Sequence, residues 1–196
     1  MTRPFIIFAL PRSRTKWLSE WLAYDGRKVG HDIAIECATP DEFLERLSGL
    51  AGTVETSAML AWRLLRSRLP NARFMTVRRP VEDVRASFAR FGITPQPDEL
   101  EERDAMLDAL EDDLARNGRD FFRVRFDQLG DEIIRCALFH ELTGVLLPLH
   151  HDIRFRRNIQ IDLPARMAYL AANQDRIQNL KRTVREQEQA LCRTFA

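Results

Sequence analysis

Residues 8–18, "FALPRSRTKWL", contain the end of an apolar run, a basic turn and the start of a second apolar segment. The apolar run 5–10 has the length of a buried strand. Beyond the turn, apolar side chains recur at helical spacing, namely Trp17, Leu18, Trp21 and Leu22. The sequence therefore predicts a strand, a basic turn and a helix in that order.

The basic turn predicts a site for an anion rather than a solvated helix cap. A turn that opens a helix presents backbone N–H groups and the positive end of the helix dipole, and both favour a bound phosphate. Arg12, Arg14 and Lys16 add full positive charges, while Ser13 and Thr15 add hydroxyl donors. The glycines of the Walker A sequence GxxxxGK[ST] are absent, so the phosphate-binding loop of ATPases and kinases is poorly supported.

Composition limits the classes of partner. The formal net charge of the 196 residues is +1, which argues against a whole-molecule attraction to nucleic acid or to an anionic membrane. The three cysteines are far apart, which excludes a disulfide framework and a zinc knuckle and suits the reducing cytoplasm. No apolar run reaches transmembrane length, and His150 and His151 lack a spaced third ligand, so we expect them in a solvated loop.

Strand and helix patterns alternate along the chain, which predicts an α/β fold of three layers with a mostly parallel central sheet flanked by helices. Strands are expected at 4–9, around Val29, and at 52–55, 72–77 and 120–126. Parallel strands place their carboxyl ends at one edge of the sheet, where ligands bind. The turn "VRRP", with Arg78, Arg79 and Pro80, follows a strand just as the first basic turn does. Two basic turns would therefore face one ligand.

The chain divides into an α/β domain at 1–160 and a long, charged C-terminal helix at 161–196. Leucine, isoleucine or valine recurs every seven residues on that helix, at Leu163, Leu170, Ile177, Val184 and Leu191. We expect the helix to pack on the same domain, and a homodimer through it is the alternative.

At this point the residues resemble the sulfotransferases that use 3'-phosphoadenosine 5'-phosphosulfate (PAPS). Three stretches carry the resemblance. The first strand of that family ends in a loop of the type Pro-Lys/Arg-Ser-Gly-Thr-Thr-Trp-Leu, matched here at 11–18. A later strand of the family ends in Arg-x-Pro with a serine on the next helix, matched here by Arg78, Arg79, Pro80 and Ser87. The third stretch is "VRFDQL" at 124–129, which is similar to the family's Val-Arg-Tyr-Glu-Asp-Leu at the end of a late strand. Arg14 stands at the family's glycine, and only the basic run 154–158 stands in for its late Arg-Lys-Gly segment.

The resemblance implies a P-loop NTPase-like fold, PAPS as donor, adenosine 3',5'-bisphosphate (PAP) as product, and no metal. It implies a function, the transfer of a sulfuryl group to a hydroxyl or amine of a small-molecule or polymer acceptor. Arg12 would stabilise the leaving oxygen and help to hold the donor. The other residues that the resemblance assigns to donor binding are Ser13, Arg14, Thr15, Lys16, Trp17, Arg78 and Ser87.

The family takes its catalytic base from the region after the first helix, where His31 is our candidate, with Asp32, Glu36 and Glu55 as alternatives. Two other functions stay open. The chain could be a P-loop kinase-like phosphotransferase, although it lacks the glycines of the Walker A sequence. It could also be a catalytically degenerate member of the fold that serves as a binding or assembly module, which Arg14 at the glycine position would suit.

Overall fold

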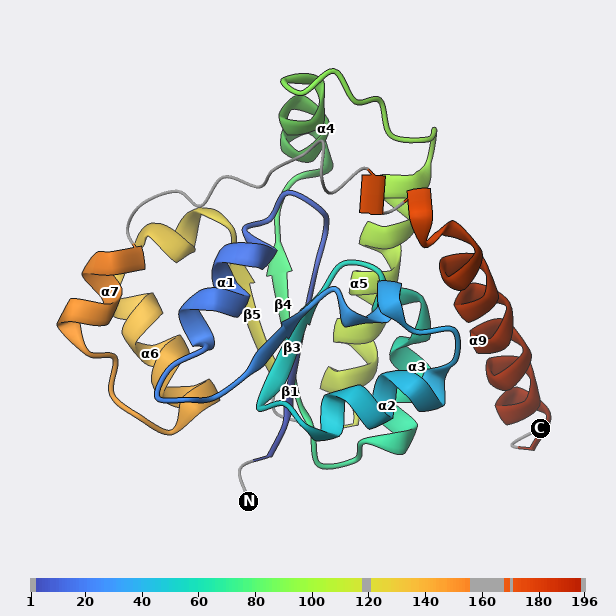
Figure 1. The fold of residues 1–196 in the computed structure, drawn as a ribbon, viewed down its shortest axis with the longest axis horizontal. Coiled ribbons are helices and arrows are strands. Elements are labelled where there is room, and N and C mark those ends of the chain that lie inside the picture. Colours follow the sequence, from blue (N-terminus) through green and yellow to red (C-terminus); the bar gives the residue numbers. More distant parts are fainter. Residues whose placement is uncertain (1–2, 118–120, 156–167, 170, 195–196) are drawn as a thin grey trace.

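A computed structural model describes residues 3–117, 121–155, 168–169 and 171–194. The described residues form a three-layer α/β structure around a five-stranded sheet (Figure 1). The strands are β1 (Phe5–Ala9), β2 (Val29–His31), β3 (Gly52–Glu55), β4 (Arg73–Arg78) and β5 (Phe121–Arg125). The α-helices are α1 (Thr15–Leu22), α2 (Pro40–Ser48), α3 (Trp62–Arg68), α4 (Val81–Ala89), α5 (Glu99–Arg116), α6 (Glu132–Thr143), α7 (Leu149–Phe155) and α9 (Gln174–Thr194). Three short 3₁₀ helices are η1 (Ile33–Glu36), η2 (Ala58–Ala61) and η3 (Asp127–Gly130).

The sheet order is β2-β3-β1-β4-β5, and every neighbouring pair is parallel. The α/β prediction is confirmed, and each strand lies where the sequence pattern predicts one. β1 is the central strand, since Phe5 is in register with Gly52 of β3 and with Arg73 of β4. Gly52 allows the close pairing, because a Cβ atom there would lie 2.4 Å from the Phe5 ring.

Side chains of β1 alternate between two apolar cores. Phe5 and Ile7 pack with Trp21 of α1 and with α6 on one side, while Ile6 and Phe8 pack with α2, α3 and α5 on the other. Burial of all five β1 residues explains their continuous apolar run. Figure 1 shows α1, α6 and α7 on one side of the sheet and α2, α3, α5 and α9 on the other.

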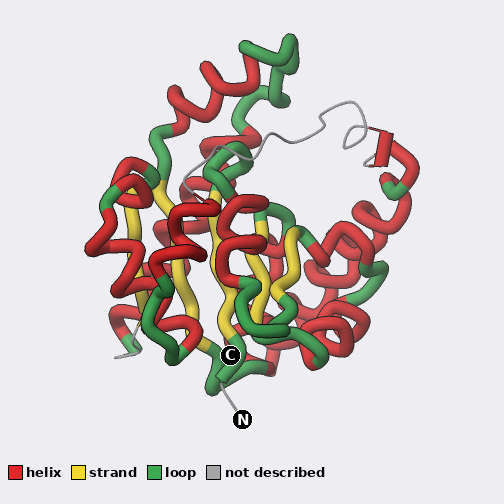
Figure 2. Tube along the Cα trace, turned by 60° about the vertical axis from the view of Figure 1, so that its left-hand side comes forward, coloured by secondary structure: helices red, strands yellow, loops and turns green. Residues whose placement is uncertain are grey.

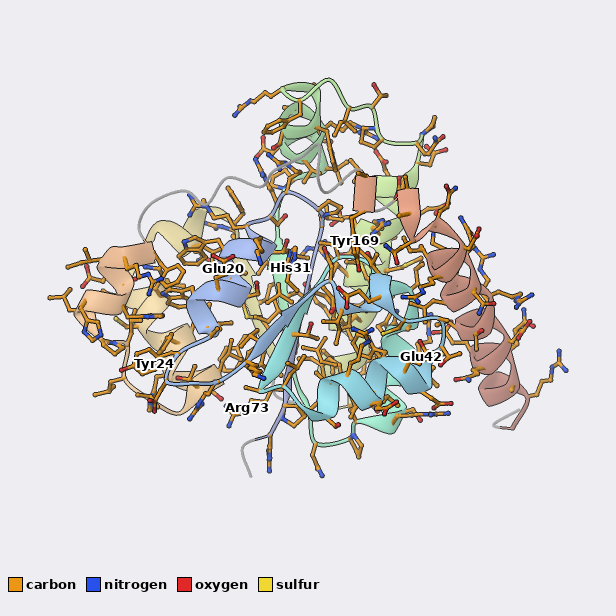
Figure 3. All side chains as sticks on the ribbon, viewed as in Figure 1. Glu20, Tyr24, His31, Glu42, Arg73 and Tyr169 are labelled. Carbon is orange, nitrogen blue, oxygen red and sulfur yellow. The ribbon has the colours of Figure 1, made fainter. Side chains whose placement is uncertain are left out.

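All carboxyl ends of the strands meet at the upper edge in Figure 1, and α4 stands beyond that edge in both views (Figure 1, Figure 2). Figure 3 shows the polarity of the sheet, with His31 at the end of β2 near the upper edge and Arg73 at the start of β4 near the lower one. The turns 10–14, 79–80 and 56–57 therefore share one edge of the sheet.

The segment after α6 differs from the predicted loop, because residues 149–155 form helix α7. His151 is buried, and its Nε2 lies 2.7 Å from the carbonyl oxygen of Trp21. Arg135 of α6 makes a buried ion pair with Asp152, with 2.8 Å between Nε and Oδ1. The expectation of a solvated histidine loop is wrong for His151, because these two contacts and the Phe139 ring draw α7 onto the core.

Helix α9 packs through Leu180 and Val184 on the core that Ile6 and Phe8 form with α2, α3 and α5. The proposed domain boundary at 160/161 lies outside the described residues, as do Leu163, Leu170 and the run 156–158, and the side chain of Leu191 is likewise not described. None of the helices in the described part of the chain combines the length and apolarity that crossing a bilayer requires.

Candidate active site at the carboxyl edge of the sheet

The turn after β1 has an unusual backbone. Arg12 and Arg14 both have positive φ angles, of 67° and 60°. A left-handed backbone at a residue with a Cβ atom is unfavourable by about 1 to 2 kcal/mol, and two such residues in three positions mark a strained turn. Arg14 is the N-cap of α1 and makes no side-chain capping bond. The arginine thus adopts a backbone conformation that glycine favours.

Ser13, between these two arginines, is fully buried, and its hydroxyl has no hydrogen-bond partner among the described residues. A buried hydroxyl normally finds a partner, and leaving one without a partner is destabilising by about 1 to 3 kcal/mol. The Nε of Arg79 is also buried and has no described partner. Two unsatisfied donors beside the N-terminus of α1 fit a ligand that supplies acceptor oxygens.

The two basic turns meet. The Nε of Arg12 donates to the Oγ of Ser87 on α4 at 3.2 Å, and Arg79 donates to the carbonyl oxygen of Arg12. Two rings support the guanidinium groups: that of Arg12 lies 4.3 Å from the centroid of Phe91, and those of Arg79 and Arg14 lie 4.2 and 5.2 Å from the centroid of Phe126.

Burial lowers the pKa of Arg12 and of Arg79 from the ordinary value of arginine. For Arg79 the nearby charges of Arg12, Arg90 and Arg14 lower the pKa further, whereas Asp83 opposes the shift. Both guanidinium groups remain cationic because arginine starts so far above neutrality. An anion at this edge would relieve the repulsion among these cations.

Arg78 lies outside this cluster, and its predicted role in holding the donor stays a prediction. Its guanidinium lies 3.0 Å from Asp104 and 2.6 Å from Asp108, and its Nη1 lies 3.7 Å from Glu111, all on α5. Side chains alternate along a strand, so Arg78 shares the α5 side of the sheet with Thr76, whose hydroxyl donates to Glu111. The next residue, Arg79, falls on the other side. The period-two alternation of side chains along β4 could have shown that Arg79, and not Arg78, lies on the side of the basic turn.

The side chains of Lys16 and Trp17 contact other parts of the protein, and their predicted role in donor binding stays a prediction. Lys16 pairs with Glu20 at 3.1 Å, with 43% of its side chain exposed. Trp17 is buried in the core, stacks on Trp21 at 5.1 Å between centroids, and donates from Nε1 to the carbonyl oxygen of Phe155 at 2.5 Å. Its side chain packs α1 against α7.

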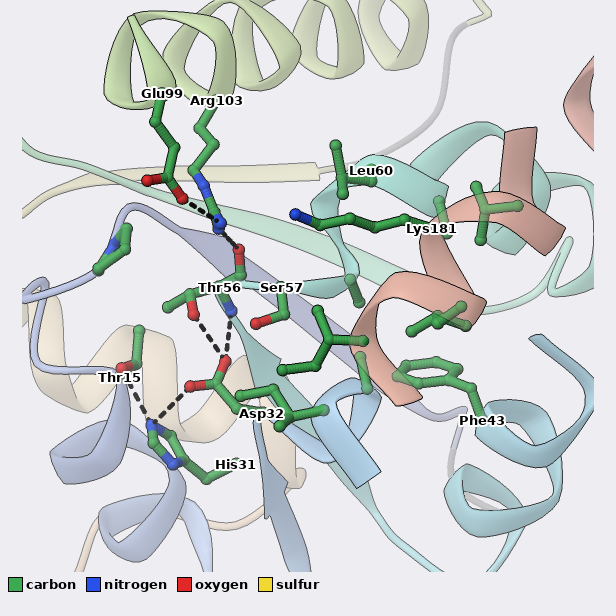
Figure 4. Close-up of a pocket in the computed structure, with 18 of the residues that line it drawn as sticks. Thr15, His31, Asp32, Phe43, Thr56, Ser57, Leu60, Glu99, Arg103 and Lys181 are labelled. Atoms are coloured by element: carbon green, nitrogen blue, oxygen red, sulfur yellow. Dashed lines mark hydrogen bonds and ion pairs between the residues drawn. The ribbon is translucent and has the colours of Figure 1, made fainter. Parts of the chain in front are cut away.

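A polar network joins α1 to the ends of β2 and β3 (Figure 4). Thr15 Oγ1 and His31 Nε2 share a hydrogen bond of 3.1 Å, and His31 Nε2 lies 3.7 Å from Asp32 Oδ2. Asp32 Oδ1 accepts from the backbone N–H of Thr56 at 2.6 Å and from its hydroxyl at 2.9 Å. The network fixes the histidine beside the basic turn, with a carboxylate close enough to stabilise an imidazolium.

The other two candidate bases do not line the cavity beside His31. Glu36 is half-exposed and pairs with Arg46. Glu55 is buried behind Asp32, where its Oε1 accepts from Ile33 N at 2.9 Å and from the Thr53 hydroxyl at 2.6 Å. Burial, and then the charge of Asp32, raise the pKa of Glu55 to about 8.

A cavity of about 360 Å³ opens between the basic turn and α9 (Figure 4). Arg12, Thr15, His31 and Asp32 line one part of it. Most of the remaining wall is apolar and comes from η1, η2 and α9 with parts of α2 and α3. The volume is within the range of small-molecule sites. Among the described residues, no group of three or more His, Cys, Asp or Glu side chains could hold a metal ion.

Sequence comparisons with known proteins find little: no family model matches the chain, and no curated protein matches it. A structural comparison matches the crystal structure of sulfotransferase STF1 from Mycobacterium tuberculosis, with a TM-score of 0.50 and 14% sequence identity. The match covers 92% of this chain and 77% of the other. At this identity the likeness concerns the fold alone. The chain has a sulfotransferase-like α/β fold, and Arg12, Thr15, His31 and Asp32 line part of a cavity at the carboxyl edge of its sheet.

Proposed function

We propose that the protein is a sulfotransferase that moves a sulfuryl group from PAPS to a hydroxyl or amine acceptor. The single observation that carries the proposal is the convergence of Arg12, Ser13, Arg79 and Ser87 at the N-terminus of α1, beside a cavity with a histidine in its wall. The fold likeness to a sulfotransferase supports it. The unpartnered Ser13 hydroxyl and Arg79 Nε are the kind of donors that phosphate oxygens would satisfy.

The residues divide between the two ends of such a donor. Backbone N–H groups at the start of α1, with the hydroxyls of Ser13 and Thr15, would hold the 5'-phosphosulfate. Arg79 and Ser87 would hold the 3'-phosphate in place of Arg78. Arg12 contacts both elements, through its position in the turn and its hydrogen bond to Ser87, and would neutralise charge that develops on the leaving phosphate.

When bound, the donor would supply an activated sulfuryl group. A bond between sulfur and the acceptor oxygen or nitrogen would form as the bond between sulfur and the phosphate oxygen breaks, and PAP would leave with the electron pair of the broken bond. The proton of the acceptor hydroxyl passes to the imidazole of His31. Asp32 stabilises the imidazolium that results, because its carboxylate lies 3.7 Å from His31 Nε2.

Calorimetric titration of the full chain with PAP tests this function without an acceptor. We expect saturable binding and a higher melting temperature with PAP. A parallel titration with ATP and Mg²⁺ tests the phosphotransferase alternative. Stabilisation by ATP and Mg²⁺ but not by PAP would indicate a phosphotransferase instead. Stabilisation by neither would refute a nucleotide donor.

A further inference from the structure

The cavity wall contains a cation that the proposed sulfuryl transfer does not use. Lys181 of α9 lines the cavity, and Figure 4 shows its side chain extending from α9 into it, with the amine on the side of Leu60 and Ser57. Within the described ranges, no ion pair or hydrogen bond joins Lys181 to another residue. The remaining charged groups of the cavity wall are engaged with protein partners.

Arg12 donates to Ser87, and Glu99, Arg103 and Asp32 also have protein partners. Glu99 and Arg103 form an ion pair of 2.8 Å, and Arg103 also donates to the carbonyl oxygen of Thr56 at 2.5 Å. The carboxylate of Asp32 accepts two hydrogen bonds from Thr56. Among the described residues facing the cavity, Lys181 therefore has no carboxylate to neutralise it, and the part of the wall near α9 carries an excess of positive charge.

The position of Lys181 on its helix makes this charge informative. Ile177, Leu180 and Val184 lie four, one and three residues away from Lys181 and form the face of α9 that lines the cavity. A lysine on the apolar face of a surface helix is unfavourable unless its ammonium finds a partner or reaches water. Lys181 is half-buried among these apolar neighbours and directed into the cavity. A ligand anion there would supply the partner.

We propose that the cavity takes an apolar small molecule with an anionic group, held by Lys181, and a hydroxyl at the His31 end. Its role as the sulfuryl acceptor rests on the proposed function, whereas its binding does not. The apolar wall would bury the body of the molecule. The cavity volume of about 360 Å³ limits that body to small-molecule size. This chemistry describes a hydroxy acid and disfavours a neutral alcohol or a large polymer.

Two probes of the same shape test the inference. They are para-hydroxyphenylpropanoate and para-propylphenol, which share a phenolic hydroxyl and a three-carbon chain and differ in the carboxylate. We expect the full chain to bind the carboxylate at least tenfold more tightly in calorimetric titrations with and without PAP. Lys181→Met keeps a long apolar side chain and should abolish that preference, while affinity for para-propylphenol and PAP stays unchanged.

Arg185→Met is the matched control, because Arg185 is an exposed cation on the same helix that does not line the cavity. It should keep the preference. Equal binding of both probes by the unchanged protein, binding of neither, or a preference that survives Lys181→Met would overturn the inference. Loss of PAP affinity in Lys181→Met would also overturn it, since Lys181 would then serve the donor. A protein that prefers the carboxylate but does not bind PAP would retain this inference and refute the proposed function.

Discussion

The Nε of Arg12 donates a hydrogen bond to the Oγ of Ser87 at 3.2 Å, although the two residues are 75 positions apart in the chain. Arg12 follows the central strand β1, and Ser87 lies on the helix after β4. Because β1 and β4 are parallel neighbours, their following segments meet at the same edge of the sheet. The contact joins the two basic turns into one candidate anion site.

The adjacent arginines provide an internal test of that site. Arg79→Ala should weaken PAP binding by about 1.5 kcal/mol or more, which is over tenfold in Kd, because it removes a cation at the anion site. Arg78→Ala should change the Kd less than twofold and instead lower the free energy of unfolding, because Asp104 and Asp108 lose their counter-ion and Glu111 keeps, among the described residues, only Arg123. Calorimetry and urea denaturation measure the two effects. Equal losses of PAP affinity in both variants would contradict the assignment.

His31→Ala should reduce turnover by about 10²-fold or more while the Kd for PAP stays within a few-fold, because the histidine is assigned to the acceptor and not to the donor. Steady-state kinetics with para-hydroxyphenylpropanoate and calorimetry with PAP measure the two quantities. Asp32→Asn is the comparison variant, since the amide oxygen can still accept from Thr56. Full activity of His31→Ala with an inactive Asp32→Asn would move the base to Asp32.

Arg14→Gly should be more stable than Arg14→Ala by about 1 kcal/mol, because both lose the guanidinium and only alanine keeps a Cβ atom at a φ of 60°. The order should reverse at Lys16, inside α1, where glycine is less favourable than alanine by about 1 kcal/mol. Urea denaturation of the four variants gives the comparison. Equal stability of the two Arg14 variants would show that the turn is not strained at this residue.

Glu55 should make stability depend on pH. Its pKa is raised from 4.5 to about 8 in the folded protein, so the folded state binds more protons than the unfolded state between these values. The contribution of Glu55 is therefore fully present below about pH 4.5 and is lost as the pH rises towards 8. Glu55→Gln stays neutral, so its free energy of unfolding should exceed that of the unchanged protein by more than about 1 kcal/mol at pH 8 and converge with it at pH 5. If the free energies of unfolding of the two proteins changed in parallel with pH across this range, the assignment of the pH dependence to Glu55 would be wrong.

Buried strands and helix caps could be read from the sequence because their causes are local. The apolar run of β1 reports burial on both faces, and Thr39 and Pro40 start α2 as predicted, with the Thr39 hydroxyl accepting from Glu42 N at 3.2 Å. The helix α7 was missed because its main anchors, His151 and Asp152, are polar residues that are buried only through contacts with α1 and α6.

The candidate site could be predicted in part. Placing both basic turns at one sheet edge follows from a parallel sheet, which the alternating pattern indicates. The choice between Arg78 and Arg79 depends on which face of β4 each side chain takes, and α5 supplies acidic partners only on one face. The positive φ angles at Arg12 and Arg14, and the ring of Phe126 between two guanidinium groups, depend on tertiary packing that no local pattern encodes. The position of Lys181 in the cavity wall could not be predicted either, because it depends on how α9 packs.

The central position of β1 also has a consequence for synthesis on the ribosome. Phe5 pairs with Gly52 and Arg73, so β1 leaves the ribosome before either of the strands with which it pairs. At about 5 to 20 residues per second the apolar stretch 5–10 stays exposed for several seconds. We therefore expect nascent chains that end before β3 to require chaperones, and folding to begin only once β4 has left the exit tunnel.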